Sequence, residues 1–240
     1  MNLHLVIGTP MYGGMCTSEY TQSLLNLSES ANKSGVKLTT IFLGNESLIQ
    51  RGRNTIAHHF MNLPDATHLL FIDADIKFRT EDIVKMIQAD KSLIIGPVAL
   101  KGYNWDEIRQ AAVNGEDDIG RTGGVFNINH LPGIDMVNEN EPFEIEHGGN
   151  AFMMIRRDVF ETLKPHTPIY TNGGRSLPDG VEIFDYFRVE INKDTNHLLS
   201  EDYFLCHSYR QVGGKVWCAP WVETGHFGSH LFNGKYTRNN

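Results

Sequence analysis

Short apolar runs alternate with helical patterns over the first 95 residues, and this alternation restricts the chain to few folds. The runs are short enough to be buried strands, and they lie at residues 3–7, 36–43, 67–72 and 92–95. Amphipathic spacing between them predicts helices at residues 17–33, 49–61 and 81–89. Strands and helices that alternate in this way form a parallel sheet with helices on its faces. We therefore predict an α/β fold.

The second half of the chain does not keep this rhythm. Residues 115–124 are acidic and glycine-rich, and residues 134–145 suggest short antiparallel strands. A loop is expected at residues 164–179, which are rich in Pro, Gly, Thr and Asn. Further elements are predicted as strands at residues 151–155 and 215–219 and helices at residues 158–163 and 201–212. No repeat or linker separates the halves, so we expect one domain with one shared sheet.

Charge and cysteine content limit the partners and the compartment. The net charge is −8, which gives no general attraction to nucleic acid. Cys16, Cys206 and Cys218 are odd in number and lack the spacing of a metal site, so reduced thiols are expected. No stretch of about 18 apolar residues predicts a membrane span, and no secretory signal is evident. These features favour a cytoplasmic protein.

Two acidic residues follow the third apolar run. Asp73 and Asp75 come directly after residues 69–72, and the period-two geometry of a strand can point both carboxylates the same way. In open α/β sheets, ligands bind at the edge that is formed by the carboxyl ends of the strands. Adjacent carboxylates repel each other, and a hard divalent cation would relieve that repulsion. The pair therefore favours a metal site, whereas the alternative is a solvated turn, in which Asp is common.

Five segments in a fixed order carry a resemblance to a known family. Their sequences are QRGRNTIA at 50–57, HLLFIDADI at 68–76, GGNAFMMIRR at 148–157, SEDYF at 200–204 and HFG at 226–228. This series resembles the motifs of GT-A glycosyltransferases, especially small viral and bacterial ones that use nucleotide sugars. The resemblance extends over about residues 3 to 232 and implies a GT-A fold, with a nucleotide-binding half and an acceptor half.

The resemblance implies a donor site at the first loop. Thr9, Pro10 and Tyr12 would hold the nucleobase, and UDP is the implied nucleotide, with GDP as the alternative. Gly148 and Gly149 would let the backbone approach the sugar, because glycine has no side chain in the way. A plain turn is the competing interpretation of these two glycines.

The resemblance also implies a metal. Asp73 and Asp75 would bridge the ribose and the cation, and His226 would complete the metal shell. Carboxylate and water ligands suit Mn²⁺ or Mg²⁺, and a histidine ligand favours Mn²⁺. A histidine near the end of the chain is otherwise a surface or packing residue.

Arginine and acidic side chains supply the remaining chemistry. Arg53 fits the motif better than Arg51, and a guanidinium suits a diphosphate, although a surface ion pair remains the alternative. Asp202 or Glu201 could take the proton of an acceptor hydroxyl as the general base. Acids at a helix start also complement the helix dipole, so both interpretations stay open for this pair.

The resemblance therefore implies a single GT-A domain over residues 1–240. Residues 1–100 would form the nucleotide-sugar-binding half and residues 101–240 the acceptor and catalytic half. The expected activity is transfer of a hexose or pentose from a UDP-sugar to a hydroxyl of a glycan, glycoprotein or other acceptor. The alternatives are a non-catalytic nucleotide-sugar-binding module and a transferase acting on hydroxylated bases of viral DNA, which the acidic charge disfavours. A nucleotidyltransferase would need a richer glycine loop than Gly13 and Gly14 provide.

Overall fold

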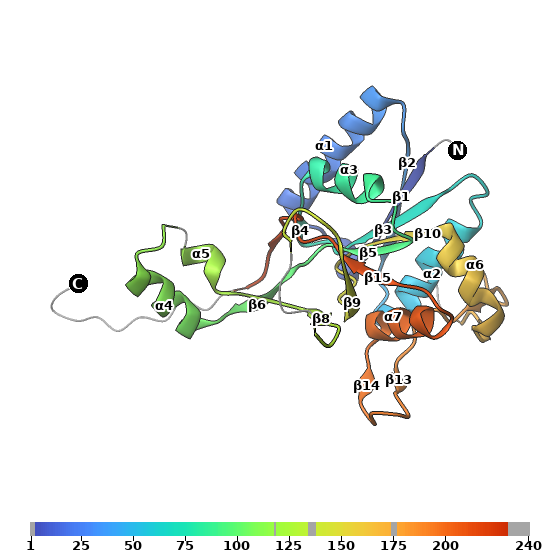
Figure 1. Ribbon diagram of the computed structural model, residues 1–240. Helices are drawn as coiled ribbons and strands as arrows, with labels where there is room; N and C mark the ends of the chain where they lie inside the picture. The colour runs from blue at the N-terminus through green and yellow to red at the C-terminus, as the bar shows by residue number, and fades with distance from the viewer. Residues whose placement is uncertain (1–2, 118, 134–137, 174–176, 230–240) are drawn as a thin grey trace.

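A mixed eight-stranded sheet forms the centre of the protein. The structure is a computed structural model, and it describes residues 3–117, 119–133, 138–173 and 177–229. The strands of the sheet are β1 (His4–Met11), β2 (Lys37–Gly44), β3 (His68–Ile72), β5 (Leu93–Ile95), β8 (Ile128–His130), β9 (Phe143–Gly148), β10 (Phe152–Arg156) and β15 (Val216–Cys218). Their order across the sheet is β2-β1-β3-β10-β5-β15-β9-β8, as Figure 1 shows. Both halves of the chain thus contribute to the same sheet, and the predicted α/β class is confirmed.

The order of the strands corrects one expectation. β1 pairs in parallel with β2 and β3, as the alternation predicts. β10 then lies between β3 and β5 and runs antiparallel to both, so the fourth apolar run does not extend a continuous parallel sheet. All four residues from Phe152 to Ile155 are buried, and a run that is buried on both faces belongs at the centre of a sheet. Periodicity predicts such strands but not their neighbours.

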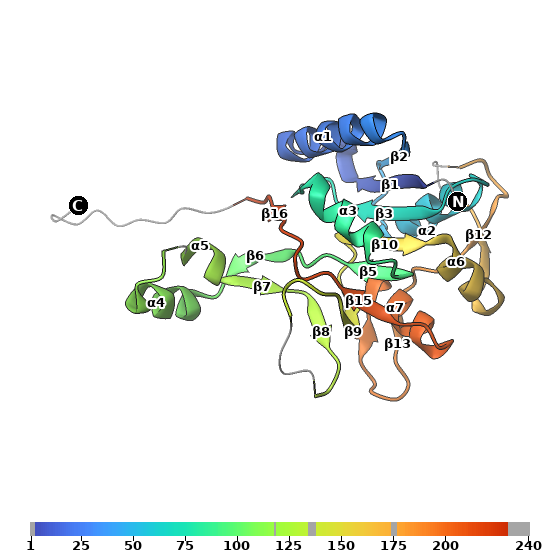
Figure 2. The same ribbon diagram turned by 45° about the horizontal axis from the view of Figure 1, so that its top comes forward.

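Helices cover both faces of the sheet. The α-helices of the described residues are α1 (Ser18–Ser34), α2 (Ile49–Met61), α3 (Thr80–Gln88), α4 (Trp105–Asn114), α5 (Ile119–Thr122), α6 (Arg157–Leu163) and α7 (Glu201–Gln211), and all but α4 and α5 lie against the sheet. α1 and α3 pack on one face, and α2, α6 and α7 on the other (Figures 1 and 2). The hydroxyl of Thr17 caps α1 by accepting a hydrogen bond from the Tyr20 amide at 3.2 Å. Gly35, with φ at 67°, ends the same helix in the left-handed region.

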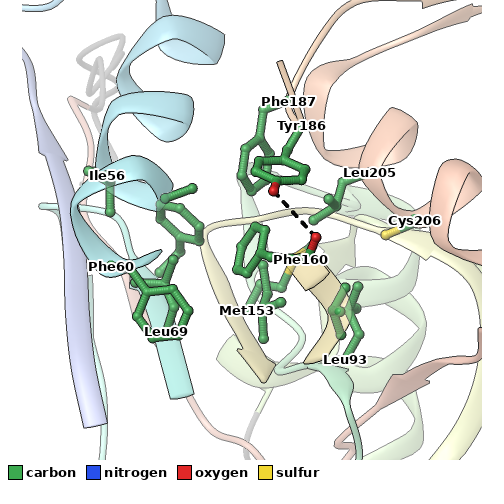
Figure 3. Close-up of a cluster of buried hydrophobic side chains, with 14 of the residues drawn as sticks. Ile56, Phe60, Leu69, Leu93, Met153, Phe160, Tyr186, Phe187, Leu205 and Cys206 are labelled. Atoms are coloured by element: carbon green, nitrogen blue, oxygen red, sulfur yellow. Dashed lines mark hydrogen bonds between the residues drawn. The ribbon is translucent and has the colours of Figure 1, made fainter. Parts of the chain in front are cut away.

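The core under α2 and α7 places the functional residues of those helices. Ile56 and Phe60 of α2 and Leu205 of α7 are buried against apolar side chains of β3, β5 and β10 (Figure 3). Burying each such side chain stabilises the fold by about 1.5–3 kcal/mol. Ile56 lies one turn after Arg53, and Leu205 lies one turn after Glu201. The core therefore fixes the start of α7 relative to α2.

Short elements complete the fold outside the central sheet. β6 (Ala99–Tyr103), α4, α5 and β7 (Gly124–Phe126) form an arm that projects from the body (Figures 1 and 2). Antiparallel pairs are also formed by β4 (Ile76–Lys77) with β16 (Gly225–His226), β11 (Ile169–Thr171) with β12 (Glu182–Phe184), and β13 (Glu190–Ile191) with β14 (Leu198–Leu199). Two 3-10 turns are η1 (Tyr12–Gly14) and η2 (Lys164–His166).

Two predicted segments lie only partly within the described residues. The strand-rich stretch at residues 134–145 includes 134–137, which lie outside the described residues, and its last part begins β9. The loop expected at 164–179 includes 174–176, also outside them, and its described part contains η2 and β11. No pattern in the sequence predicts α4, which lies in the arm. Among the described residues, no helix is both long enough and apolar enough to cross a membrane.

Candidate active site

The third strand delivers both predicted acids to one end of the sheet. The Asp73 amide donates to the Ala151 carbonyl at 3.1 Å, which ties the end of β3 to the turn before β10. Asp73 and Asp75 both line a cavity of 450 Å³, here called the strand-end cavity. Pro10 of β1 and Tyr12 of η1 also line it, and the Tyr12 side chain is exposed. The carboxyl ends of parallel strands thus meet at a cavity of a size typical for small-molecule sites.

The predicted nucleobase residues occupy different positions. Pro10 and Tyr12 face the strand-end cavity. Thr9 is buried instead, and its hydroxyl bonds to the Tyr20 hydroxyl at 2.6 Å. Thr9 therefore anchors α1 to β1 in the core. In the sequence, the apolar strand passes into the loop without a break. The pattern therefore could not indicate which of these residues is buried and which face the cavity.

Arg51 and Glu46 form an ion pair beside the strand-end cavity. Two guanidinium nitrogens of Arg51 donate to the Glu46 carboxylate, at 2.7 and 2.8 Å. This hydrogen bonding lowers the pKa of Glu46 from its ordinary value of 4.5, although burial opposes the shift. Glu46 also lines the cavity. Arg51 is therefore paired with an acid. This is the surface ion pair that the sequence offers as the alternative to diphosphate binding.

Arg53 joins two segments that lie far apart in the sequence. Its Nη2 donates to Asp73 Oδ1 and its Nε donates to Glu201 Oε1, both at 3.2 Å. The guanidinium is buried and lies 5.4 Å from the centre of the Phe71 ring. Burial works against its charge, but the negative charges of the surrounding acids outweigh burial and raise the pKa of Arg53. Arg53 thus holds Asp73, 20 positions after it, beside Glu201, 148 positions after it.

Asp202 is fixed at the start of α7 by three donors. Its Oδ1 accepts from the Tyr203 amide at 2.8 Å and from the Ser200 hydroxyl. Its Oδ2 accepts from the backbone amide of Asn150 at 3.3 Å, in the turn between β9 and β10. The carboxylate is therefore oriented by both the helix start and this turn. An acid that only complemented the helix dipole would not need the contact with Asn150.

Gly148 and Gly149 pack the same turn tightly against the protein. A Cβ atom on Gly148 would lie 3.0 Å from Cδ1 of Ile128, and one on Gly149 would lie 3.2 Å from Nδ2 of Asn127. The Gly149 amide also donates to the Asn127 carbonyl at 3.0 Å. A side chain at either position would therefore force these neighbours to shift by a few tenths of an ångström. Close packing thus accounts for both glycines, and their contact with a sugar remains a prediction.

Asp75 has a separate set of neighbours. Lys101 Nζ donates to Asp75 Oδ2 at 2.5 Å, and His226 Nε2 lies 3.6 Å from Asp75 Oδ1. Pairing of β16 with β4 brings His226 to this position, and the Phe227 amide donates to the Asp75 carbonyl at 3.0 Å. His226 Nδ1 lies 2.7 Å from the Ala99 carbonyl oxygen, so Nδ1 carries the proton. In the neutral form of the ring, this tautomer leaves the lone pair on Nε2, which faces Asp75.

The three predicted metal ligands are brought together only in part. Asp75 and His226 are neighbours, and the bond from Nδ1 to a carbonyl is the support that metal-binding histidines have. Asp73 is engaged by Arg53 instead. Over the described ranges, no three His, Cys, Asp or Glu side chains gather closely enough to hold a metal ion. Two protein ligands still fit Mg²⁺ or Mn²⁺, because such ions take their other ligands from water and substrate phosphates.

Two residues near the site were not singled out from the sequence. Lys101 is an isolated lysine 26 positions after Asp75, so no local pattern relates the two. Asn150 is 1% exposed, and neither Nδ2 nor Oδ1 of its side chain has a hydrogen-bond partner within the part of the chain that the structure describes. A buried amide without partners is costly and marks a place where a ligand or water completes the bonding. The one feature of the sequence that could have singled out Asn150 is its position directly after two glycines.

No protein-family model and no curated protein matches this sequence. Among solved structures, A197 from STIV matches with a TM-score of 0.51 and 12% sequence identity, over 98% of this chain and 99% of A197. A glycosyltransferase involved in the glycosylation of the major capsid of PBCV-1 has a TM-score of 0.35 and 11% identity, over 68% of this chain and 64% of that one. HddC from Yersinia pseudotuberculosis has a TM-score of 0.32 and 14% identity, over 66% and 79%. The first similarity shows a shared fold, and the two lower scores support no structural conclusion.

Proposed function

We propose that this protein is a metal-dependent glycosyltransferase of the GT-A type, which transfers a sugar from a UDP-sugar to an acceptor hydroxyl. The observation that carries the proposal is the buried bridge from Arg53 to Asp73 and Glu201. It places the acid at the end of β3 beside the acidic start of α7. A glycosyl transfer needs these two functions in one site, because the donor is held by one group and the acceptor proton is taken by another.

The strand-end cavity is the proposed donor site. Its volume of 450 Å³ lies in the range of small-molecule pockets. The exposed ring of Tyr12 can lie against a nucleobase, and Pro10 forms the neighbouring wall. Asp73 and Asp75 would face the ribose and diphosphate side. UDP is proposed as the nucleotide on the resemblance to small GT-A enzymes.

Asp75 and His226 are the proposed protein ligands of a manganese or magnesium ion. When bound, the ion neutralises the charge that develops on the departing diphosphate. Lys101 holds the same carboxylate at 2.5 Å, so it must give up part of that contact when a cation binds. Its ammonium would then be available to a phosphate oxygen. Arg53 keeps Asp73 in place and acts as a positioning residue.

Asp202 is the proposed general base. The acceptor oxygen forms its bond to the anomeric carbon while the bond from that carbon to the diphosphate oxygen breaks. The electron pair of the broken bond leaves with UDP, and the hydroxyl proton passes to the Asp202 carboxylate. Glu201 is bonded to Arg53, which favours Asp202 for this role. The proposed acceptor is a hydroxyl of a glycan or glycoprotein.

A panel of nucleotide sugars with Mn²⁺ tests this function. Release of nucleoside diphosphate and of free sugar is measured together, with UDP affinity determined by calorimetry in the presence and absence of chelator. We expect one UDP-sugar to be hydrolysed slowly and UDP to bind far more tightly with Mn²⁺. Binding without turnover of any donor would favour a non-catalytic module. Tight binding of GDP instead of UDP would change only the nucleotide, and no binding of either would contradict the proposal.

A further inference from the structure

The two edges of the central sheet are built differently. β2 forms one edge, as Figure 1 shows, and β8 forms the other. β8 contains three residues, and its pairing with β9 shifts register. Short and irregular edges of this kind block the addition of a further strand. β2 instead contains eight residues that pair with β1 in one continuous register, and no described strand lies on its other side.

The sequence of β2 leaves this edge open to pairing. Residues 38–44 contain no proline and no charged side chain. The one charged residue of the strand, Lys37, stands at its first position and pairs with Asp65 of the same chain. Eight extended residues span about 27 Å. A long, regular and uncharged edge is a template on which another strand can form backbone hydrogen bonds.

Phe42 lies on β2, on the face of the sheet that α1 covers. Side chains alternate along a strand, so Leu38, Thr40 and Phe42 share one face. Leu38 packs against the core on the α1 side, which identifies this face. The Phe42 side chain is 50% exposed, and in the described part of the chain it joins neither apolar cluster of the core. Its ring is therefore available to a partner.

A groove of 480 Å³ lies beside the same edge, and we call it the edge groove. Leu25, Ser28 and Asn32 line it from one face of α1, because they are three or four positions apart. Val36 and Leu38 line it from the side of β2. The Leu25 side chain is 59% exposed. The edge groove therefore offers apolar surface, and it is large enough for a phenyl ring.

A second copy of β2 fits this edge. If two β2 strands pair antiparallel about a twofold axis at Thr40, each Leu38 lies opposite the Phe42 of the other copy, because both are two positions from the axis. Opposite residues of such a pair point to the same face. Each Phe42 ring would thus reach the edge groove beside Leu38 of the other copy. Lys37 would lie opposite Leu43, so no like charges would meet.

We propose that the protein forms a twofold dimer in which the β2 strands of two copies pair antiparallel around Thr40. Each Phe42 ring fills the edge groove of the other copy, and one continuous sheet crosses the interface. A twofold contact of this kind is closed, because each copy covers the open edge of the other. The proposal does not depend on the transferase function, since neither Thr40 nor Phe42 lines the strand-end cavity.

Sedimentation equilibrium of the full chain, with variants at Thr40, tests the proposed axis. We expect a dimer at about 100 μM. Thr40→Lys places two ammonium groups opposite each other, and Thr40→Glu places two carboxylates there, so each variant should weaken the dimer about tenfold or more. An equal mixture of the two variants should restore it, because opposite charges then face each other. Thr171→Lys is the control, since Thr171 is an exposed threonine on β11.

Phe42→Ala tests the contact with the edge groove. It removes two rings from each dimer, so the dimer should weaken about tenfold or more. Phe126→Ala is the matched control, because Phe126 is also 50% exposed but lies on β7. Circular dichroism and melting temperatures establish that all variants are folded.

Three outcomes would overturn the proposed dimer. The first is a monomeric wild-type protein at about 100 μM. The second is a dimer that Thr40→Lys and Phe42→Ala leave intact, or a mixture of the two Thr40 variants that is no more dimeric than each variant alone, since the interface would then lie elsewhere. The third is a series of growing assemblies, because a twofold contact stops at two copies.

Discussion

The two acids of the Asp-Ala-Asp segment differ in their partners far more than in their exposure. The side chains of Asp73 and Asp75 are 30% and 32% exposed. Asp73 pairs with Arg53, whose side chain is 5% exposed, whereas Asp75 pairs with Lys101, which is 44% exposed. A buried arginine with two acids is a fixed link, while a lysine on a flexible stem can leave. The comparison indicates that Asp73 holds the site together and Asp75 is free to exchange partners.

The largest expected effect is on turnover, and it concerns the start of α7, which Arg53 links to Asp73. Asp202→Asn should lower turnover about 10²- to 10⁴-fold, because the amide keeps the shape of the side chain but cannot take a proton. UDP affinity should change little, since the donor is held elsewhere. The melting temperature should fall modestly, because the NH2 group of Asn cannot accept the hydrogen bond that the backbone amide of Asn150 donates to Asp202. Steady-state rates of UDP release, calorimetry and thermal unfolding measure the three quantities. Normal turnover in this variant would mean that the acid is structural or that Glu201 is the working base.

Arg53→Ala should produce the next largest effect, and it should be on stability. Truncation leaves Asp73 and Glu201 without their shared cation in a partly buried site, and breaking such a buried bridge costs about 3–5 kcal/mol. Denaturant unfolding measures this loss. Arg109→Ala is the control, because its ion pair with Asp106 is exposed on α4 and should be worth less than about 1 kcal/mol. Equal losses in the two variants would contradict the distinction between fixed and exchangeable partners.

The sequence predicts the Asp73–Arg53 pair better than the Asp75–Lys101 pair. Asp73 and Arg53 belong to segments with strong patterns, an apolar strand and an amphipathic helix, so the placement of those elements could be expected. The proximity of Arg53 to Glu201 depends on how β10 inserts into the sheet and how α7 packs, which are long-range effects that periodicity does not contain. Lys101 could not be predicted, because its position depends on the irregular pairing of β6 with β7.

On the Asp75 side, Asp75→Asn should weaken manganese-dependent UDP binding about ten- to a hundredfold. The estimate corresponds to the loss of one charge-assisted contact, about 1.5–3 kcal/mol. Calorimetry of UDP with and without Mn²⁺ measures it, and stability should be preserved, because the lost partner Lys101 is exposed. If the variant binds UDP as tightly as wild type in Mn²⁺, Asp75 is not a ligand.

Lys101→Met sharpens the same comparison with a smaller effect of opposite sign. Removing the ammonium frees the Asp75 carboxylate, so Mn²⁺ affinity should rise roughly two- to fivefold, the equivalent of ~0.4–1 kcal/mol for an exposed pair. Methionine keeps most of the apolar stem. Electron paramagnetic resonance of free Mn²⁺ measures the affinity without UDP. A fall in UDP affinity with no gain in Mn²⁺ affinity would show instead that the lysine is the cation of the diphosphate site.

The smallest effect concerns Glu46, the third acid that lines the strand-end cavity, and it tests whether a paired acid there is as fixed as Asp73. The bond from Arg51 lowers the pKa of Glu46 in the folded protein below its ordinary value of 4.5. The folded state therefore favours the charged form, so the pair contributes stability above pH 4.5, and this contribution is lost as the pH falls through the lowered pKa. Glu46→Gln should lower the free energy of unfolding at about pH 7 and narrow its difference from wild type at about pH 3.

Urea unfolding at both pH values measures the Glu46 difference. Glu29→Gln is the control, because the Glu29 carboxylate is 66% exposed and pairs with Lys33 on the surface. A general effect of lost charge would appear in both variants. If the difference between Glu46→Gln and wild type is the same at both pH values, the Arg51 pair does not depend on the charge of Glu46. The pair would then be held by packing, and Asp73 would be the one acid of the cavity whose partner is fixed by charge.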